Sequence, residues 1–325
     1  MADRDTRPRL LADIGGTNTR LALQRSGQPA EAIRRYANAE HEGLGPLIRH
    51  YLDRLPGTRR PHQAALAVAS PMTGDRVHLT NLGWEFSIEQ LRDELALEAL
   101  EVVNDFAAVA LAIPALEADQ WTAIGDGEAV PLTPVGALGP GTGLGVAGLV
   151  HSGDAWVAIP GEGGHATLPA GDAEQAQIIE SARTEVGHVS AERLLSGPGL
   201  ARLYAIVSAR DGGGAHRAPE PPEITRRAVA GSDPLAAQTL ALFLSMLGGV
   251  AGDLALTLGA RGGIYLAGGI LPDIAAYLAG SRFRESFVAK GRFRPYLEAI
   301  PTRLITHPYP AFPGLGLHLD QLGAR

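Results

Sequence analysis

Each half of the chain begins with a strand, a tight glycine-rich turn and a second strand. The first such segment runs from Arg9 to Leu23 and turns at Gly15-Gly16-Thr17-Asn18, and the second runs from Val135 to Val150 around Gly139-Pro-Gly-Thr-Gly-Leu-Gly145. Glycine lets several backbone N–H groups approach a phosphate closely, without side chains in the way. Two similar hairpins predict two related domains that face a cleft, although a Gly-Thr turn is common by itself.

The other elements predict an α/β fold, because strand patterns alternate with helical patterns. The predicted strands outside the hairpins cover residues 64–69, 100–103 and 263–266. A helix that starts at Asp172 is expected to bury one face. That face consists of Ala176, Ile179, Ala182 and Val186. A short helix from Ser190 is expected to stop at Gly197-Pro198-Gly199, since glycine and proline interrupt helices.

The stretch from Leu235 to Leu258 is apolar and long enough to cross a bilayer. Gln238 and Asp253 interrupt it, and Ser232-Asp233-Pro234 is an ordinary helix start. We therefore expect a helix buried in the protein and no membrane partner. The charged N-terminus lacks the apolar stretch of a secretory signal, which predicts a cytoplasmic location.

Composition excludes several classes of site. The 325 residues contain no cysteine, so disulfides, thiolate nucleophiles and cysteine-ligated zinc are excluded. Lys290 is the only lysine and precedes Gly291-Arg292, which excludes a P-loop and the protein-kinase pattern. The net charge of −7 argues against a nucleic-acid partner. Gly143–Gly148 matches G-x-G-x-x-G but leads into a strand, which excludes a Rossmann site.

The Gly-Thr turns are suited to bind a phosphate chain, because a threonine hydroxyl adds a donor to the backbone N–H groups. Asp13 precedes the first turn. A carboxylate beside bound phosphates is where Mg²⁺ is held together with its waters. The alternative is a structural role only, as two hairpins with glycine-rich turns.

Asn104 and Asp105 lie where a strand ends and a helix begins. Both residue types cap helices, so a structural role is one interpretation. The other is a general base at the carboxyl end of a strand, where α/β sheets place their ligands. A helix N-terminus favours the ionised carboxylate. Asp105 would then be a weak base that accepts a proton late in the reaction.

Three further polar side chains are candidates for ligand binding. Glu162 and His165 lie in a loop too rich in glycine to predict a regular element, and Glu192 follows the helix start at Ser190. Glu162 and His165 could ligate zinc, but two ligands do not make a zinc site. Alternatively, they could hydrogen-bond a polyol. Taken alone, Glu192 is explained by the helix dipole, which favours an acid in the first turn.

Together these segments closely resemble the bacterial glucokinases, and they occur in that family's order. The segments are Leu11–Arg20, Val103–Ala110, Gly141–Val146, Pro160–His165, Ser190–Leu200 and Leu266–Ile270, and Lys290–Phe293 is also similar. The resemblance implies the actin-like (ribonuclease-H-like) ATPase fold, with two α/β domains and a cleft between them. It places the small domain at 1–115 plus 306–325 and the large domain at 116–305.

The resemblance also implies an ATP-dependent glucose 6-phosphotransferase with Mg²⁺. It assigns Gly15, Gly16 and Thr17 to the first phosphate loop, Gly141 and Thr142 to the second, and Gly268 and Gly269 to the adenosine region. Asp13 would bind Mg²⁺ through water. Glucose would be bound by Asn104, Asp105, Glu162, His165 and Glu192, with Asp105 as the base for the 6-hydroxyl.

A related kinase and repressor family carries a cysteine-rich zinc motif, which this cysteine-free chain lacks. The short segment before Leu10 also leaves no room for a helix-turn-helix, so the repressor branch is not expected. The family implies a homodimer. Three alternatives stay open: a kinase for another hexose on the same fold, a sugar-binding sensor without catalysis, and a chaperone-like or cytoskeletal ATPase, which should lack the glucose-binding set.

Overall fold

The structure is a computed structural model that describes residues 7–55, 60–70, 72, 74–79, 82–210 and 218–323. The charged start of the chain lies outside these residues. The chain divides into two compact units. The first comprises residues 1–117, 153–160 and 307–325, and the second comprises residues 118–152 and 161–306.

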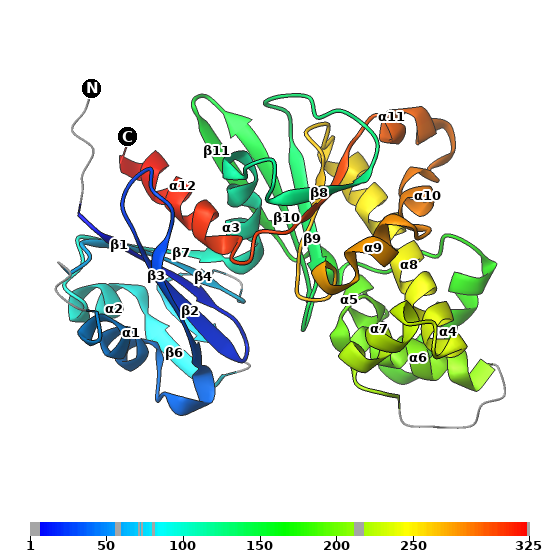
Figure 1. The fold of residues 1–325 in the computed structure, drawn as a ribbon, viewed down its shortest axis with the longest axis horizontal. Helices are drawn as coiled ribbons and strands as arrows, with labels where there is room; N and C mark the ends of the chain where they lie inside the picture. Colours follow the sequence, from blue (N-terminus) through cyan, green and yellow to red (C-terminus); the bar gives the residue numbers. More distant parts are fainter. Residues whose placement is uncertain are drawn as a thin grey trace. The chain divides into compact units, whose positions relative to one another are not determined.

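The first unit is built on a five-stranded sheet with the strand order β3-β2-β1-β4-β7 and a separate hairpin, β5-β6 (Figure 1). Its strands are β1 (Arg9–Ile14), β2 (Asn18–Gln24), β3 (Glu31–Ala37), β4 (Gln63–Val68), β5 (Arg76–Leu79), β6 (Trp84–Ser87) and β7 (Ala99–Asn104), with most of β11 (Ala155–Gly161). Its helices are η1 (Asn38–Glu40), α1 (Leu44–Asp53), α2 (Ile88–Glu94), α3 (Asp105–Ala112), η2 (Ile113–Ala115) and α12 (Ala311–Gly323).

Both faces of this sheet are covered, which explains why β1 is buried at nearly every position. Leu10 packs in one cluster with Leu47 of α1, and Leu11 packs in another with Leu315 of α12. Successive side chains of a strand point to opposite faces, so a strand between two helical layers is apolar throughout. The predicted first hairpin and the strand at 100–103 are thus confirmed as β1–β2 and β7.

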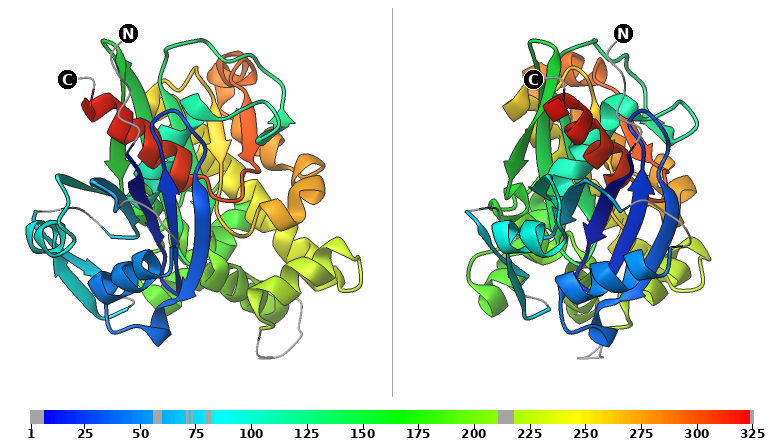
Figure 2. Two further views of the ribbon diagram at one scale, coloured as in Figure 1. Left: turned by 60° about the vertical axis from the view of Figure 1, so that its left-hand side comes forward. Right: turned by 90° about the vertical axis from the view of Figure 1, so that its left-hand side faces the viewer.

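Helices α3 and α12 pack against each other at one position where no side chain fits. A Cβ atom added to Gly314 would lie 1.9 Å from the carbonyl oxygen of Ala108. Glycine at this point therefore brings the backbones of the two helices together (α12 is red in Figure 2). Because α12 comes from the end of the chain, this contact joins it to the rest of the first unit.

In the second unit five strands lie in the order β10-β9-β12-β13-β8. These strands are β8 (Trp121–Gly125), β9 (Val135–Pro140), β10 (Leu144–Ser152), β12 (Ile264–Leu266) and β13 (Thr302–Ile305). The helices are η3 (Gly163–His165), α4 (Ala173–Val186), α5 (Ala191–Leu194), α6 (Gly197–Arg210), α7 (Pro221–Val229), α8 (Pro234–Leu258), η4 (Pro272–Ile274), α9 (Ala275–Ala279), α10 (Phe283–Val288), η5 (Gly291–Phe293) and α11 (Arg294–Glu298). The second hairpin is confirmed as β9–β10.

Helix α8 is the apolar stretch that the sequence singled out. Asp233 caps it by accepting hydrogen bonds from the N–H groups of Leu235 and Ala236. In the described part of the chain it alone is long and apolar enough to cross a bilayer, and 67% of its most apolar window is buried inside the protein. Gly248 lets α10 approach, because a Cβ atom there would lie 2.1 Å from the Phe283 carbonyl oxygen. The predicted buried helix is confirmed.

The structure extends one prediction in this unit and corrects another. The helix predicted from Ser190 is α5 and ends before Gly197-Pro198-Gly199 as expected, but these residues also open a further helix, α6. Proline needs no N–H partner in a first turn, and Ser196 Oγ accepts from Gly199 N at 3.0 Å. In α4, Ala176 is exposed and Gln175 is buried instead. Gln175 can be buried because its side-chain amide is hydrogen-bonded: Oε1 accepts from Gly171 N, and Nε2 donates to Ser245 Oγ.

Candidate functional site

The turn between β1 and β2 is a narrow loop at the end of the first hairpin. Gly15 N donates to Asn18 O at 3.1 Å, and the pairing resumes at Ile14 and Thr19. Thr17 at the tip is exposed. The turn therefore presents backbone and a hydroxyl to solvent, and the role of Gly15, Gly16 and Thr17 as a phosphate loop stays a prediction.

The buried side chain of Asn38, at the start of η1, braces this turn from behind. Asn38 Nδ2 donates to Gly15 O at 2.8 Å, and Asn38 Oδ1 accepts from Thr19 Oγ1 at 2.8 Å. Asn38 N also donates to Thr17 O at 3.0 Å. One residue thus fixes three points of the hairpin. No sequence pattern marks Asn38 for this role, since an asparagine after a strand is ordinary.

Asp13 pairs with an arginine on the neighbouring strand. Asp13 and Arg20 lie opposite each other in the β1–β2 register, and Arg20 Nη1 lies 2.8 Å from Asp13 Oδ2. Burial raises the pKa of Asp13 above its usual value, and the charge and hydrogen bond of Arg20 oppose that rise. Arg20 was not among the predicted site residues, although the cross-strand register makes it a neighbour of Asp13.

The predicted Mg²⁺ site at Asp13 has few side chains that could bind a metal. Among the described residues no three histidine or acidic side chains gather closely enough to hold an ion. Asp13 Oδ2 is taken by Arg20, so this residue offers a single further oxygen. That arrangement fits Mg²⁺, which commonly binds one carboxylate together with waters and substrate phosphates. It does not fit a cage made by the protein alone.

Asn104 and Asp105 lie at the same edge of the first sheet as the hairpin turn. Strands β1, β4 and β7 are parallel, and Ile14, Val68 and Asn104 are aligned across them. The carboxyl ends of parallel strands meet at one edge, where such sheets bind ligands. The first unit therefore brings together the predicted first phosphate loop and the predicted base.

The structural interpretation of the Asn104-Asp105 pair is confirmed, while the role of Asp105 as a base stays a prediction. Asn104 is the N-cap of α3, and its Oδ1 accepts from Phe106 N at 3.0 Å and Ala107 N at 3.1 Å. Asp105 is the first residue of α3, and its Oδ1 accepts from Phe106 N at 2.8 Å. These bonds fix the carboxylate at the helix N-terminus. The side chain of Asp105 is partly exposed.

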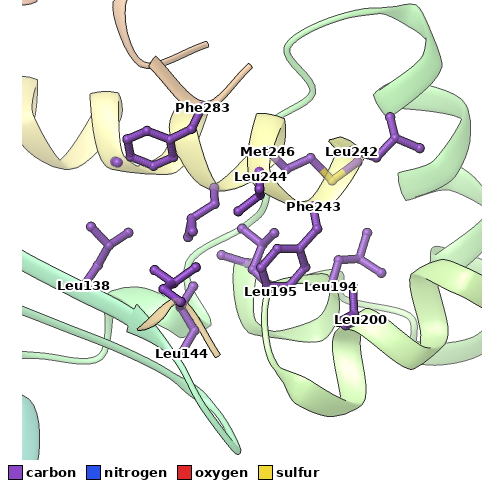
Figure 3. Packing of buried hydrophobic residues seen from close by; sticks show 14 of the residues in the cluster. Leu138, Leu144, Leu194, Leu195, Leu200, Leu242, Phe243, Leu244, Met246 and Phe283 are labelled. Atoms are coloured by element: carbon purple, nitrogen blue, oxygen red, sulfur yellow. The ribbon is translucent and has the colours of Figure 1, made fainter. Parts of the chain in front are cut away.

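The turn between β9 and β10 is held by a backbone bond within it and by the backbone of one other segment. Gly141 N donates to Gly143 O, and Gly141 O accepts from Gly197 N at the start of α6, both at 2.8 Å. Below the turn, Leu138 and Leu144 point into a core with Leu200 and Phe243 (Figure 3). The exposed Thr142 lies at the tip. The predicted second phosphate loop is thus anchored on a packed core.

Gly268 lies directly beside this hairpin. It follows β12, which runs parallel to β9, and its φ of +88° suits glycine. A Cβ atom on Gly268 would lie 2.3 Å from the Pro140 carbonyl oxygen, whereas Gly269 has open space. The structure therefore brings the predicted adenosine residues next to the second phosphate loop.

Glu162, His165 and Glu192 form one cluster. His165 Nε2 lies 3.9 Å from Glu162 Oε2, and His165 Nδ1 lies 4.0 Å from Glu192 Oε1. These distances exceed a hydrogen bond, and the side chains are 62%, 55% and 31% exposed for His165, Glu162 and Glu192. The three groups can therefore accept a polar ligand without first breaking bonds between them.

The cluster exists because two segments are joined by short backbone contacts. Ala191 N donates to Ala166 O at 2.9 Å, and Leu168 N donates to Val189 O at 3.0 Å. The glycine-rich loop forms a 3₁₀ turn, η3, contrary to the expectation of no regular element. Gly164 makes the turn possible, because a Cβ atom there would lie 2.1 Å from Leu144 O. The contact also explains why glycine is required.

Of the predicted site residues, the first unit carries Asp13, Gly15, Gly16, Thr17, Asn104 and Asp105, and the second carries Gly141, Thr142, Glu162, His165, Glu192, Gly268 and Gly269. Within each unit they lie together. Beyond this prediction, Asn38 and Arg20 also belong to the surroundings of the first set.

Comparison with known proteins gives consistent matches. A family model described as Glucokinase matches residues 10–322. The glucokinase of Paramagnetospirillum magneticum is 47% identical over 321 residues, which are 97% of this chain and 98% of that protein. A solved glucokinase from an Antarctic psychrotroph superposes with a TM-score of 0.88 at 38% identity, covering 97% of this chain and 99% of that chain.

A more distant structure extends the fold comparison. It is a glucokinase of the ROK family from Streptomyces griseus, solved in complex with glucose and AMPPNP. Its TM-score is 0.65 at 18% identity, and it covers 97% of this chain and 98% of that chain. At this identity the likeness concerns the fold, which is that of the actin-like ATPases. With the match across nearly its whole length, the chain belongs to the glucokinase family.

Proposed function

We propose that this protein transfers the γ-phosphoryl group of ATP to the 6-hydroxyl of glucose, giving glucose 6-phosphate and ADP. The observation that carries the proposal is the cluster of Glu162, His165 and Glu192, directly beside a glycine-rich hairpin, in a chain of the glucokinase family. Sugar hydroxyls need both hydrogen-bond acceptors and donors, which two carboxylates and an imidazole provide.

In this proposal the two hairpins bind the phosphates of ATP. The N–H groups of Gly15 and Gly141 close the two turns. The N–H groups of Gly16, Thr17 and Thr142 and the two threonine hydroxyls offset negative charge on the phosphates, which is the main protein contribution to phosphoryl transfer. Gly268 and Gly269 approach the adenosine. Asp13 would hold Mg²⁺ through water, and the ion would neutralise charge on the phosphates.

The sugar would be bound by Glu162, His165 and Glu192 together with Asn104 and Asp105. Asp105 is proposed to orient the 6-hydroxyl and to accept its proton. A carboxylate fixed by Phe106 N is a weak base, which suits a loose transition state in which the proton leaves late.

The other untested predictions from the sequence remain part of the proposal. They are the correspondence of the two units to domains 1–115 with 306–325 and 116–305, a cytoplasmic location and a homodimer.

The experiment is ADP release by the purified protein with ATP and magnesium, with and without glucose, and with mannose, fructose and N-acetylglucosamine alongside. Release that depends on glucose supports the proposal. Release with a different sugar would keep the fold and the chemistry but change the substrate. Glucose binding without any release would identify a sensor.

Asp105→Asn tests the base directly. We expect a folded protein whose turnover falls about a hundredfold or more, which is the usual contribution of a general base. Asparagine can still accept the Phe106 N–H, so glucose affinity should change much less than kcat. Near-normal turnover would remove Asp105 from this role.

A further inference from the structure

The two carboxylate oxygens of Glu192 face different parts of the second unit. Oε1 is the oxygen near His165, at 4.0 Å from Nδ1. Oε2 instead accepts a hydrogen bond from the backbone N–H of Leu144, at 2.9 Å. Leu144 is the first residue of β10, directly after the turn of the second phosphate hairpin. One side chain therefore contacts both the sugar cluster and the hairpin.

Gly143 is the residue that makes room for this contact. A Cβ atom at Gly143 would lie 2.4 Å from Glu192 Oε2, closer than real Cβ contacts. In the same turn, a Cβ atom at Gly141 would meet nothing within 4 Å. The two glycines therefore differ in their surroundings, and only Gly143 is required by the Glu192 carboxylate.

The carbonyl side of Leu144 packs against the glycine-rich loop that carries Glu162 and His165. A Cβ atom added to Gly164 would lie 2.1 Å from the Leu144 carbonyl oxygen, so the two backbones are in direct contact there. Val146 packs against Gly163 in the same way, with its Cγ1 2.8 Å from the position of an added Cβ atom. The position of the hairpin thus depends on the segments that carry Glu162, His165 and Glu192.

We propose that Glu192 is a positioning residue for the second phosphate hairpin, in addition to its role as a sugar ligand, and that Gly143 lacks a side chain so that this carboxylate can reach Leu144. The inference rests on the proposed function, because it takes the turn at Gly141-Thr142 as a phosphate loop. A charge-assisted bond to Leu144 N fixes the end of the turn and thereby the direction of its free N–H groups. Nucleotide affinity without any sugar then depends on Glu192.

The test is the dissociation constant of ADP with Mg²⁺, measured by calorimetry in the absence of sugar, for wild type and three variants. Glu192→Ala removes the acceptor of Leu144 N and should weaken ADP binding about five- to tenfold. Glu192→Gln retains an oxygen for that N–H and should stay within about twofold of wild type. Glu162→Ala, a sugar ligand without contact to Leu144, is the matched control and should also stay there.

Glucose titrations of the same proteins separate this inference from the proposed function. All three variants should bind glucose more weakly. Unchanged ADP binding by Glu192→Ala would overturn the inference, and so would an equal loss in Glu162→Ala. A wild-type protein that binds no ADP would overturn the proposed function, and the inference with it.

A second pair of variants keeps the inference testable if Glu192→Ala does not fold. Gly143→Ala places a methyl group against Glu192 Oε2, so the Leu144 amide should exchange its hydrogen faster and glucose should bind more weakly. Gly141→Ala adds the same methyl group to open space. In the absence of nucleotide it should leave both quantities unchanged. Equal amide protection in Gly143→Ala and wild type would contradict the link.

Discussion

The hairpin β1–β2 is braced by a single residue, Asn38, which follows β3 at the start of η1, whereas β9–β10 is braced by backbone groups and by the carboxylate of Glu192. Asn38 makes every brace on the first turn. The second turn is held by a hydrogen bond from Gly197 N, a hydrogen bond to the Glu192 carboxylate and backbone packing against Gly164. The same Gly-Thr pattern is therefore independent of the sugar residues in one unit and tied to them in the other.

The largest loss of stability is expected at the backbone contact between Gly164 and Leu144. Gly164→Ala would force a Cβ atom to within 2.1 Å of Leu144 O, where no flexible side chain can move aside. We expect the free energy of unfolding to fall by about 2–3 kcal/mol, as in an overpacked core. Urea denaturation of the full chain measures it.

Gly249→Ala is the control for this change, because a methyl group there enters open space in the helix α8. It should be neutral or stabilising, since alanine favours helix over glycine. Equal unfolding free energies for the two variants would show that the backbone contact between Gly164 and Leu144 can widen at little cost. That contact would then not make the second hairpin more rigid than the first.

An intermediate effect is expected from Asn38→Ala. It leaves Gly15 O and Thr19 Oγ1 without partners and should cost about 2 kcal/mol of unfolding free energy, because unpaired buried polar groups are expensive. ADP affinity should fall, while glucose affinity should stay near wild type. Calorimetric titration with each ligand measures both.

The contrast with Gly143→Ala makes Asn38→Ala informative. Disturbing the hairpin of the second unit is expected to weaken the binding of both glucose and nucleotide. Disturbing the hairpin of the first unit is expected to weaken the binding of nucleotide only. A loss of glucose affinity in Asn38→Ala would mean that the first hairpin is also tied to the sugar residues, and the difference between the hairpins would disappear.

The smallest effect concerns Asp13. Its pKa is raised by burial and lowered again by Arg20, so Arg20→Gln should raise the pKa further. An acid with a raised pKa contributes stability below its ordinary value, about 3.9, and that contribution is lost as pH rises through the folded-state pKa. Carboxyl carbon shifts against pH measure the pKa. An unchanged value in Arg20→Gln would mean that the ion pair does not matter at this hairpin.

Much of the candidate site could be predicted from local patterns. Strand, turn and strand follow from apolar runs around Gly15-Gly16-Thr17, and Asn104 is where a cap and a strand end coincide. Helix α6 was missed although its signal was present, because Ser196 before Gly197-Pro198 is a cap followed by a first-turn proline. Glycine and proline were interpreted as a stop when they also mark a start.

The residues that were missed share a long-range cause. Asn38 is polar and buried because its partners, Gly15 and Thr19, are about twenty residues earlier in the sequence. Gln175 is buried because Ser245 lies against it, seventy residues later. No helical or strand period marks such positions, since their burial depends on a partner that only packing supplies.

By itself, the sequence determined the two hairpins, the strand end that carries Asp105, the buried course of α8 and the membership of a family. Local turn chemistry and apolar periodicity are sufficient for these, because they act between neighbouring residues. Only the tertiary structure decided which partner each polar group would find. Glu192 follows from the sequence as an acid in a first helical turn, but its bond to Leu144 exists because Gly143 leaves a space that a carboxylate from another segment can fill.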